Sequence, residues 1–465
     1  SLTIVGLAEA AVRESKDRVR SAIINSGFLF PTKRLTINLA PADLPKDGSR
    51  LDLPIALGIL IASGQLPENC TDGFEFIGEL ALDGHLRPVT GILPIAMACQ
   101  QAQHRLLVPT NNLEEANQLP QFEVYAANHL QDVCAHFLGT SHLSASPKHE
   151  NLTTTQYQFD LADVKGQLRP RRALEIAAAG GHSLLFKGPP GTGKTLLASR
   201  LPSILPPLNA QENLEVASIY SVANAQHTFG QRPFRAPHHT ASAIALVGGG
   251  SQPKPGEITL AHLGVLFLDE LPEFDRKVLE VLRQPLESKE IVISRAARQM
   301  TFPANFQFIA AMNPCPCGYA FNQDSRCQCS AENIQRYQNR ISGPLLDRID
   351  LHIDVPPLQT KELQDQSPTE SSTIVRQRVM KAYDKQMLRQ QCLNQALSPN
   401  LLEQYAQLDE NSAKIIEMAQ QRLNLSARAY HRVLRVARTI ADLAESEIIS
   451  SSHLTEALSY RGHST

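Results

Sequence analysis

Apolar residues along the first 140 positions alternate between short runs of strand type and stretches with helical spacing. Short apolar runs bounded by turn residues are typical of strands, whereas apolar residues at every third or fourth position favour helices. The expected strands are 2–5, 35–39, 74–78, 106–108 and 122–125, and the expected helices include 14–18 and 51–63. This mixture predicts an α+β N-terminal domain over residues 1–140.

Two polar stretches divide the rest of the chain. Residues 141–156 are rich in Ser, Thr and His, as in a linker, and residues 364–372 form a second polar break. We expect an α/β core over 157–358 and, because the later pattern is helical, a C-terminal helical lid over 359–465. Within the core, apolar runs with the composition of buried parallel strands are 183–186, 265–268, 306–312 and 351–355.

The clearest motif is the segment 188–195, which reads Gly-Pro-Pro-Gly-Thr-Gly-Lys-Thr and matches the phosphate-binding loop of nucleoside triphosphatases. A strand-type run precedes it and a helical segment follows, as the motif requires. Backbone N–H groups of such a loop turn inward around phosphates, and the helix N-terminus adds favourable partial charge. We expect Lys194 to reach the β- and γ-phosphates of ATP and Thr195 to ligate Mg²⁺. The residues expected around the nucleotide are Gly188, Pro189, Pro190, Gly191, Thr192, Gly193, Lys194 and Thr195.

Three further polar side chains follow strand-type runs in this core. Asp269 and Glu270 end the run 265–268, and Asn313 ends the run 306–312. Because the carboxyl ends of parallel strands form the edge at which such sheets bind ligands, we expect these side chains near the phosphate loop. Asp269 would hold the Mg²⁺ shell, and Glu270 would orient or deprotonate the attacking water. Asn313 would contact the γ-phosphate or position the same water.

Arginines in the second half of the chain are candidates for contacts with the transferred phosphate. Arg348 precedes the strand-type run 351–355 and suits an arginine finger offered in trans, with a surface salt bridge to Asp347 or Asp350 as the alternative. Arg428, Arg432 and Arg435 share one face of a C-terminal helix. We expect Arg428 to reach the nucleotide, although spacing alone fits Arg432 equally well. The order of these motifs is that of an AAA+ ATPase.

Composition limits the classes of partner. The chain has 465 residues, 42% of them hydrophobic, which is enough for substantial cores, and a formal net charge of −2, which gives no global basic field for nucleic acid. Any nucleic-acid site must therefore be local. The longest apolar stretch, 53–62, contains Pro54 and is too short to cross a bilayer, and no secretory signal leads the sequence. We expect a cytoplasmic protein with no membrane partner.

Cysteines cluster just after Asn313. Four of the eight cysteines form two Cys-x-Cys pairs within a segment, 313–330, that has the character of a knuckle. Four thiolates suit tetrahedral Zn²⁺, although the usual spacing is wider, and free cysteines are the alternative. Disulfides are disfavoured in a reducing cytosol. We expect a structural Zn²⁺ site without a catalytic role, formed by Cys315, Cys317, Cys327 and Cys329.

Two segments of the core carry arginines on expected loops. Residues 231–250 read as a long, turn-rich loop that contains Arg235. Residues 290–302 form an expected hairpin with Arg295 near its tip. Arginines on such loops grip a phosphate backbone when they line the pore of a ring. We expect Arg235 and Arg295 to bind DNA, with packing against neighbouring subunits as the alternative.

Four segments spread over the chain match one known family. They are 1–7 (Ser-Leu-Thr-Ile-Val-Gly-Leu), 232–239 (Arg-Pro-Phe-Arg-Ala-Pro-His-His), 313–318 (Asn-Pro-Cys-Pro-Cys-Gly) and 426–432 (Ser-Ala-Arg-Ala-Tyr-His-Arg). With them the chain resembles, over essentially its whole length, the competence-associated, magnesium-chelatase-like AAA+ family (ComM/YifB), whose lid is of the magnesium-chelatase C-terminal type. The resemblance implies a homo-hexameric, ATP-driven motor that migrates branched DNA. It would help to integrate incoming single strands by homologous recombination during natural transformation, alongside recombination proteins.

The same resemblance implies roles for individual arginines. The segments around Arg235 and Arg295 resemble the helix-2 and pre-sensor insertions of the chelatase and replicative-helicase clade. Arg348 resembles the arginine finger of that clade, and Arg428 resembles its second sensor.

The N-terminal region resembles the proteolytic domain of Lon, which has a ribosomal S5 domain 2-like fold. Residues 45–48 match the start of Lon's nucleophile motif, but Arg50 stands at the serine position and Ser49 lies one position early. Leu93 stands near the position of the lysine partner. A serine without a base is a poor nucleophile. We therefore expect a Lon-like, ChlI-type domain without the catalytic dyad, which serves as a ring scaffold or a DNA-binding module.

Three functions from different classes fit these motifs. The favoured one is a DNA helicase or branch-migration ATPase that acts on single-stranded and branched DNA. One alternative is a chelatase-like ATPase that remodels a protein partner, and the fused Lon-like module argues against it. The other is an ATP-dependent, Lon-like protease, which Arg50 and Leu93 disfavour. DNA-stimulated ATP hydrolysis distinguishes the first from both others.

Overall fold

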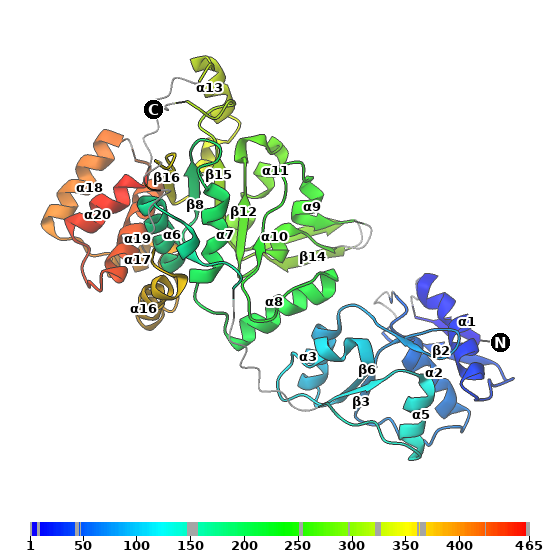
Figure 1. The fold of residues 1–465 in the computed structure, drawn as a ribbon. Coiled ribbons are helices and arrows are strands. Elements are labelled where there is room, and N and C mark those ends of the chain that lie inside the picture. The colour runs from blue at the N-terminus through cyan, green and yellow to red at the C-terminus, as the bar shows by residue number, and fades with distance from the viewer. Residues whose placement is uncertain are drawn as a thin grey trace. The chain divides into compact units, whose positions relative to one another are not determined.

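The computed structural model folds into two compact units (Figure 1). The residues described are 2–6, 10–41, 46, 48–146, 157–250, 254–295, 298–320, 327–359, 362, 369–423 and 425–461. The first unit comprises Ser1–Thr153 together with Leu214–Phe229, and the second comprises Thr154–Asn213 and Gly230–Thr465. Most of the expected linker (147–156) and most of the second polar break (363–368) lie outside the described residues.

The first unit is a mixed α/β fold with small sheets. β6 is the centre of a parallel sheet with β3 and β7, β1 pairs in parallel with β2, and β4 pairs antiparallel with β5. The strands and helices predicted for this region are confirmed, although β7 begins later than expected. The strands are β1 (Leu2–Val5), β2 (Leu35–Asn38), β3 (Phe74–Phe76), β4 (Glu79–Leu80), β5 (Leu86–Arg87), β6 (Arg105–Pro109) and β7 (Val124–Ala127). The helices are α1 (Ala10–Asn25), α2 (Asp52–Ala62), α3 (Ile92–Gln101), η1 (Thr110–Asn112), α4 (Leu113–Ala116) and α5 (Leu130–Leu138).

Helix α2 is apolar on nearly every side because it runs through the core of the first unit. Leu53 and Leu60 are fully buried. Asp52, at the start of the helix, is also fully buried, and its carboxylate lies 2.8 Å from the Arg18 guanidinium of α1. The same carboxylate accepts the N–H of Leu80 at 3.2 Å. A buried carboxylate needs such partners, so this cluster fixes α2 against α1 and β4.

The segment Leu214–Phe229 is far along the sequence, yet it completes the core of the first unit. Most of it is the end of α8 (Ala210–Ala223). Leu214 and Ala217 are buried in the cluster that includes residues of α3, β6 and β7. Ser218 Oγ lies 3.3 Å from the Met97 sulfur, and the Ser221 hydroxyl donates to Glu115. The first unit is therefore assembled from two separate stretches of chain.

A five-stranded, all-parallel sheet forms the middle layer of the second unit, with the strand order β16-β8-β15-β12-β9. Its strands are β8 (Leu184–Lys187), β9 (Phe234–Arg235), β12 (Val265–Leu268), β15 (Gln307–Met312) and β16 (Leu351–Asp354). Successive residues enter two different apolar clusters: Phe186 and Phe267 belong to one, Leu185 and Leu266 to the other. Both faces of the sheet are therefore covered, as is usual for parallel sheets. The predicted mixed α/β architecture with buried parallel strands is confirmed.

Helices flank this sheet on its two faces (Figure 1). The helices of this part of the chain are η2 (Leu161–Asp163), α6 (Leu168–Gly180), α7 (Lys194–Ile204), α9 (Ala243–Val247), α10 (Glu257–Leu260), η3 (Leu271–Glu273), α11 (Arg276–Val281), α12 (Pro285–Ser288), α13 (Ala331–Gln338) and α14 (Gly343–Leu346). A short antiparallel pair, β10 (Gly248–Gly249) with β11 (Lys254–Pro255), lies between α9 and α10 in sequence.

The stretch 231–250 is more ordered than the turn-rich loop predicted from its sequence. It contains β9, which forms the edge strand of the sheet beside β12, and the helix α9. The Phe234 ring stacks at 6.0 Å from the Phe267 ring, and the Val265 N–H donates to the Pro233 carbonyl at 2.8 Å. A strand of two residues shows no alternation of apolar and polar positions, and the prolines beside it resemble turn signals.

The predicted hairpin is confirmed as β13 (Glu290–Arg295) paired antiparallel with β14 (Arg298–Pro303). One face of the hairpin is anchored, because Ile291, Ile293 and Phe302 pack into the apolar core of the second unit. On the register, Arg295 opposes Arg298 at the turn end of the hairpin. The side chains of both arginines lie outside the described residues.

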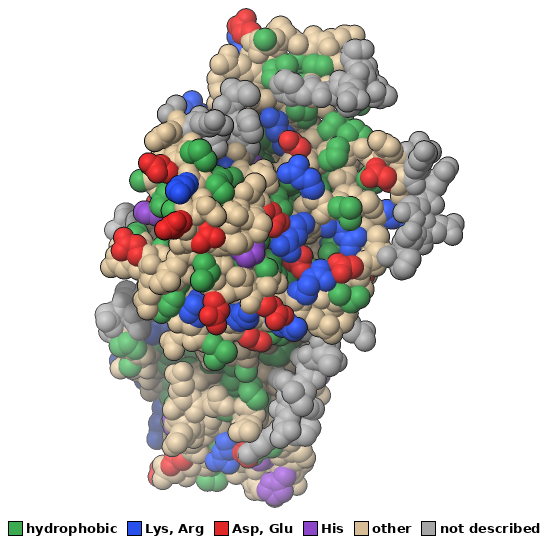
Figure 2. Space-filling model, turned by 90° about the vertical axis from the view of Figure 1, so that its left-hand side faces the viewer, with side chains coloured by type: hydrophobic (Ala, Val, Ile, Leu, Met, Phe, Trp, Pro, Cys, Tyr) green, Lys and Arg blue, Asp and Glu red, His purple; other side chains and the backbone are tan. Residues whose placement is uncertain are grey.

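The C-terminal region is helical, as predicted. Its elements are α16 (Ser372–Gln390), η4 (Asn394–Ala396), α17 (Pro399–Tyr405), α18 (Glu410–Leu423), α19 (Ala427–Leu443) and α20 (Ser451–Ser459). Figure 2, which views the molecule from the side of these helices, shows Lys and Arg intermingled with Asp and Glu. Ion pairs of α16 such as Lys381–Glu445 (3.3 Å) and Arg378–Glu370 (2.8 Å) fit that picture. Among the residues the structure describes, no helix combines the length and the apolar character that crossing a membrane requires.

Candidate nucleotide-binding site

The phosphate loop joins the end of β8 to the start of α7, so the predicted strand–loop–helix context is confirmed. Gly191 and Gly193 have φ angles of +77° and +85°, which residues other than glycine rarely adopt. Gly188 approaches β16 so closely that an added Cβ would lie 2.3 Å from the Val355 carbonyl oxygen. These three glycines therefore have a steric reason to be glycine.

Lys194 points back into the loop. Its Nζ donates to the Gly188 and Pro189 carbonyls, both at 2.7 Å, and to Asn313 Oδ1 at 3.1 Å. Burial lowers the pKa of this ammonium group, while the carboxylates of Asp269 and Glu270 oppose that shift. The contact with Asn313 links the end of β15 directly to the loop. This arrangement brings together two of the residues that the sequence placed around the nucleotide.

Thr195 and Asp269 meet at the same edge of the sheet. The Thr195 hydroxyl donates to Asp269 Oδ2 at 2.6 Å. A hydroxyl and a carboxylate oxygen are hard ligands of the kind that Mg²⁺ prefers, and Mg²⁺ usually completes its shell with water and phosphate oxygens. This pair of side chains therefore fits a Mg²⁺–nucleotide complex.

Glu270 follows Asp269 in an unusual backbone conformation. Its φ is +50°, and its N–H donates to Asp269 Oδ1 at 2.9 Å. Its carboxylate is half exposed and lies 3.1 Å from His239 Nδ1. His239 was not singled out from the sequence as a site residue, although it belongs to the Pro-His-His segment that follows β9. The available signal was the pair of adjacent histidines at the carboxyl end of a sheet strand.

Arg348 and Arg428 converge on a different place. Arg348 donates to the Pro344 carbonyl at 2.7 Å and contacts Glu287 at 2.7 Å through its second guanidinium nitrogen. Arg428 pairs with the same Glu287 oxygen. Arg432 donates to the Asp347 carbonyl and lies 3.8 Å from Asp350. Sequence reasoning did not identify Glu287, which has no motif of its own.

This arginine cluster lies at the amino edge of the sheet. A cavity of about 40 Å³ next to it is lined by Arg348 and Arg432 together with Ser183 and Phe306, which precede β8 and β15. The phosphate loop follows the opposite end of β8, about 13 Å further on at 3.3 Å per strand residue. Neither Arg348 nor Arg428 therefore lies beside the phosphate loop of its own chain.

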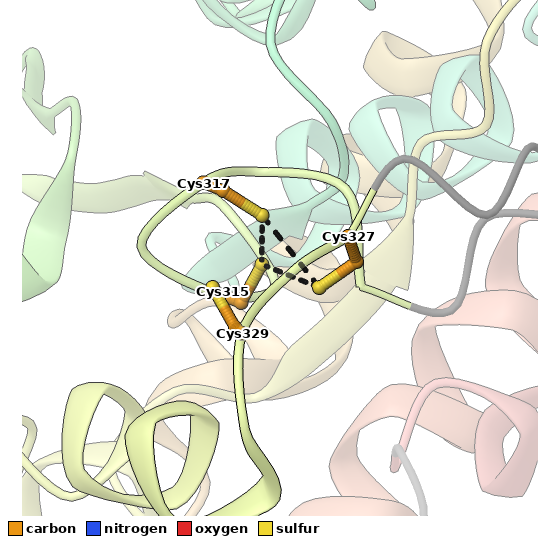
Figure 3. A group of neighbouring side chains, drawn as sticks. All are labelled: Cys315, Cys317, Cys327 and Cys329. Atoms are coloured by element: carbon orange, nitrogen blue, oxygen red, sulfur yellow. Dashed lines mark hydrogen bonds between the residues drawn. The ribbon is translucent and has the colours of Figure 1, made fainter.

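The cysteines predicted to bind metal come together (Figure 3). The Sγ atoms of Cys315, Cys317, Cys327 and Cys329 all lie within 4.8 Å of one another. Hydrogen bonds to its sulfur from the Tyr319 backbone and the Cys315 side chain lower the pKa of Cys317 to about 6. Such a cluster could hold a metal ion. Residues 321–326, in the middle of the knuckle, lie outside the described residues.

Of the two candidate DNA-binding arginines, Arg235 is half-buried and paired with an acid. Arg235 is the last residue of β9, and its guanidinium makes two contacts of 2.7 Å with the Glu257 carboxylate. Arg295 ends β13. The side chain of Arg295 lies outside the described residues.

The N-terminal residues related to Lon chemistry are also placed. The Ser49 hydroxyl donates to Glu79, whose carboxylate lies 3.6 Å from Arg87. Leu93 is fully buried in the apolar cluster of α3. Lys46 donates to the Pro41 carbonyl. Among the described residues, the hydrogen-bond partner of the Ser49 hydroxyl is an acid and not a lysine.

Comparisons with known proteins identify the chain. Three family models match it in order: subunit ChlI of Mg-chelatase over residues 1–112, magnesium chelatase subunit ChlI over 160–363 and its C-terminal part over 369–461. The chain is 50% identical over 467 residues to competence protein ComM of Haemophilus influenzae, which covers 99% of this chain and 91% of that protein. It is 50% identical over 465 residues to the uncharacterized protein YifB of Escherichia coli, with the same coverage. It is 41% identical over 468 residues to the uncharacterized protein Rv2897c of Mycobacterium tuberculosis, which covers 98% of this chain and 92% of that protein. The chain therefore belongs to the magnesium-chelatase-like AAA+ family of ComM and YifB.

Proposed function

We propose that this protein is an ATP-driven motor that moves branched DNA during homologous recombination. The observation that carries the proposal is the set of side chains at the carboxyl edge of the parallel sheet: Lys194 with Asn313, and Thr195 with Asp269, beside Glu270. The family of the chain suggests ATPase activity, and the competence protein ComM is among its 50% identical relatives. That relationship favours DNA as the object of the motor.

The hydrolytic step follows from the roles of these residues. Lys194 would contact the β- and γ-phosphates, and Thr195 and Asp269 would hold Mg²⁺, which supplies charge neutralisation when bound. Glu270 would orient the attacking water, after its carboxylate leaves His239. Asn313 would contact the γ-phosphate, and its hydrogen bond with Lys194 would link that contact to the phosphate loop.

The position of Arg348 supports a ring. Since Arg348 is at the opposite edge of the sheet from its own phosphate loop, we propose that it acts on the nucleotide of a neighbouring copy in a homo-hexamer. Arg428, which shares Glu287 with it, would approach the same neighbour as a second sensor. The Lon-like first unit would serve as a scaffold of this ring or as a further DNA contact.

DNA would be gripped by the β13–β14 hairpin. The hairpin is rooted in the apolar core through Ile291 and Phe302, whereas Val292 is exposed on its other face. Arg295 opposes Arg298 next to the turn, so this end of the hairpin carries two positive charges. A rooted hairpin with a basic tip suits a moving contact with a phosphate backbone.

The experiment that tests the proposal is ATP-dependent movement of a labelled three- or four-strand DNA junction. We expect the wild-type protein to exchange strands, and Lys194→Ala and Glu270→Gln variants to show no movement above the level without ATP. ATP hydrolysis that is indifferent to DNA, together with an immobile junction, would contradict the proposal and favour a chelatase-like remodeller of a protein partner. Casein cleavage abolished by Ser49→Ala would favour a protease.

Charge reversal at the hairpin tip tests the DNA contact. We expect Arg295→Glu to weaken binding of a single-stranded oligonucleotide and to flatten the dependence of that binding on salt, because a phosphate contact releases counterions. Binding of a fluorescent ATP analogue should be unchanged. The matched control is Arg336→Glu, since Arg336 is an exposed arginine on α13 whose pair is Glu332. If Arg295→Glu and wild type bound DNA with equal affinity, the tip of the hairpin would not be part of the DNA contact surface.

A further inference from the structure

The four-cysteine cluster has the dimensions of a closed zinc site. With a Zn–S bond of about 2.3 Å, the edge of a tetrahedron of sulfurs is about 3.8 Å. The sulfur–sulfur distances are 3.3 Å for Cys315–Cys317, 3.8 Å for Cys315–Cys327 and 3.6 Å for Cys317–Cys327. The Ala320 N–H also donates to the Cys315 sulfur at 3.3 Å, as is typical of the outer shell of metal thiolates. Four cysteine ligands leave no open position, so the site suits a structural ion.

The knuckle that holds these cysteines lies directly on the phosphate loop. Gly318, between the two cysteine pairs, has a φ of +88°, and a Cβ added there would lie 2.6 Å from Cδ of Pro190. Pro190 is part of the phosphate loop, next to the Pro189 carbonyl that holds Lys194. The backbone of the knuckle therefore sets one wall of the loop.

The same knuckle also fixes Asn313. Cys315 follows Asn313 by two positions, and Asn313 accepts a hydrogen bond from Lys194. The intervening Pro314 carbonyl accepts a hydrogen bond from Gln338 Nε2 at 3.0 Å, at the end of α13. Cys315 is buried, whereas Cys317 is exposed and Cys327 and Cys329 are half-exposed. Because three of the four cysteines are not buried, burial does little to hold their side chains, and cross-linking through a metal would hold them.

We propose that a Zn²⁺ ion bound by Cys315, Cys317, Cys327 and Cys329 holds Pro190 and Asn313 in place, so that nucleotide affinity depends on the metal. The proposal rests on the nucleotide site proposed above and is independent of what the motor acts on. The ion takes no part in hydrolysis. Its effect passes through two contacts, Gly318 with Pro190 and Asn313 with Lys194.

The metal content of the full chain is the first measurement. Elemental analysis of protein purified in a reducing buffer should give about one Zn²⁺ per chain, in line with four thiolate ligands. Cys327→Ser and Cys329→Ser should lose the metal. Cys392→Ser is the matched control, because Cys392 is also a half-buried free thiol but lies outside the cluster. Wild-type protein without bound metal would overturn the proposal.

Nucleotide binding is the second measurement. Removing the metal with a strong chelator should weaken binding of a fluorescent ATP analogue by roughly 10- to 100-fold, the range by which loss of outer-shell partners lowers metal affinity or activity at metal sites. Zn²⁺ should restore the affinity and Mg²⁺ should not. Unchanged affinity in protein shown to be metal-free would overturn the coupling and leave the nucleotide site intact. An absence of ATP binding in the zinc-loaded wild type would instead contradict the proposed function.

A third variant separates the metal from its contact with the loop. Gly318→Ala places a methyl group against Pro190 in a backbone region that alanine rarely adopts. We expect this variant to retain Zn²⁺ and yet bind the ATP analogue more weakly than wild type. Full affinity with full metal content would show that the knuckle does not act through Pro190.

Discussion

Replacing Arg348 with alanine is expected to lower kcat for ATP hydrolysis by about 10³- to 10⁵-fold, the range measured for arginine fingers, while ATP binding persists. The physical reason is that a guanidinium group stabilises charge that develops on the transferred phosphoryl group only in the transition state. Arg348 is largely buried and fixed by Pro344 and Glu287, so it is already held in one orientation. Steady-state hydrolysis and analogue binding measured together check this result. The control is Arg336→Ala, which removes an exposed arginine from α13.

The position of Arg348 makes a sharper form of this experiment possible. Lys194→Ala and Arg348→Ala should each be inactive alone, because one lacks the phosphate contact and the other lacks the finger. Mixed and reassembled, they should regain part of the activity at interfaces that carry an intact Lys194 on one copy and an intact Arg348 on the next. No recovery in mixed assemblies would contradict action in trans. If Arg348→Ala alone had only a mild effect on kcat, Arg348 would not be an arginine finger, and its contact with Glu287 would be an ordinary surface ion pair.

Replacing Glu270 with glutamine is expected to lower kcat by about 10²- to 10⁴-fold, which is the usual contribution of a general base. Glutamine keeps the size of the side chain and its contact with His239, so ATP should still bind and remain unhydrolysed. Single-turnover hydrolysis with labelled ATP measures the loss of the chemical step. Glu273→Gln is the matched control, since Glu273 lies on η3 and pairs with Arg340 at 2.8 Å. Near-normal single-turnover rates in Glu270→Gln would show that a group other than Glu270 activates the attacking water.

The parts of the site that could be predicted from the sequence are those in which neighbours in sequence are neighbours in space. The phosphate loop is local, and Asp269 and Asn313 follow apolar runs that the structure shows as β12 and β15. Parallel strands place their carboxyl ends at one edge of the sheet, so the proximity of these separate segments could be predicted. The hairpin β13–β14 was predictable for the same reason, because its pairing is local.

The parts that could not be predicted depend on contacts between distant segments with no pattern of their own. The two-residue strand β9 is too short to show a period, although its Phe234 stacks on Phe267. Glu287 could not be predicted as a site residue, because an acid before a strand is common. Only the fold brings Arg348 and Arg428 to it. The pairing of His239 with Glu270 likewise depends on β9 lying beside β12. The assignments of the domain boundaries and of the Lon-like fold stay predictions.

The division of the first unit between two stretches of chain has a consequence for synthesis on the ribosome. Its core lacks Leu214 and Ala217 until the segment Leu214–Phe229 has been made. By then the strand β8, the phosphate loop and the helix α7 have already been translated. The N-terminal unit therefore cannot be completed before the nucleotide-binding segment has left the exit tunnel. If residues 1–153 were deleted, Leu214 and Ala217 would be left uncovered on the remaining chain. We therefore expect the second unit produced without the first to expose an apolar surface.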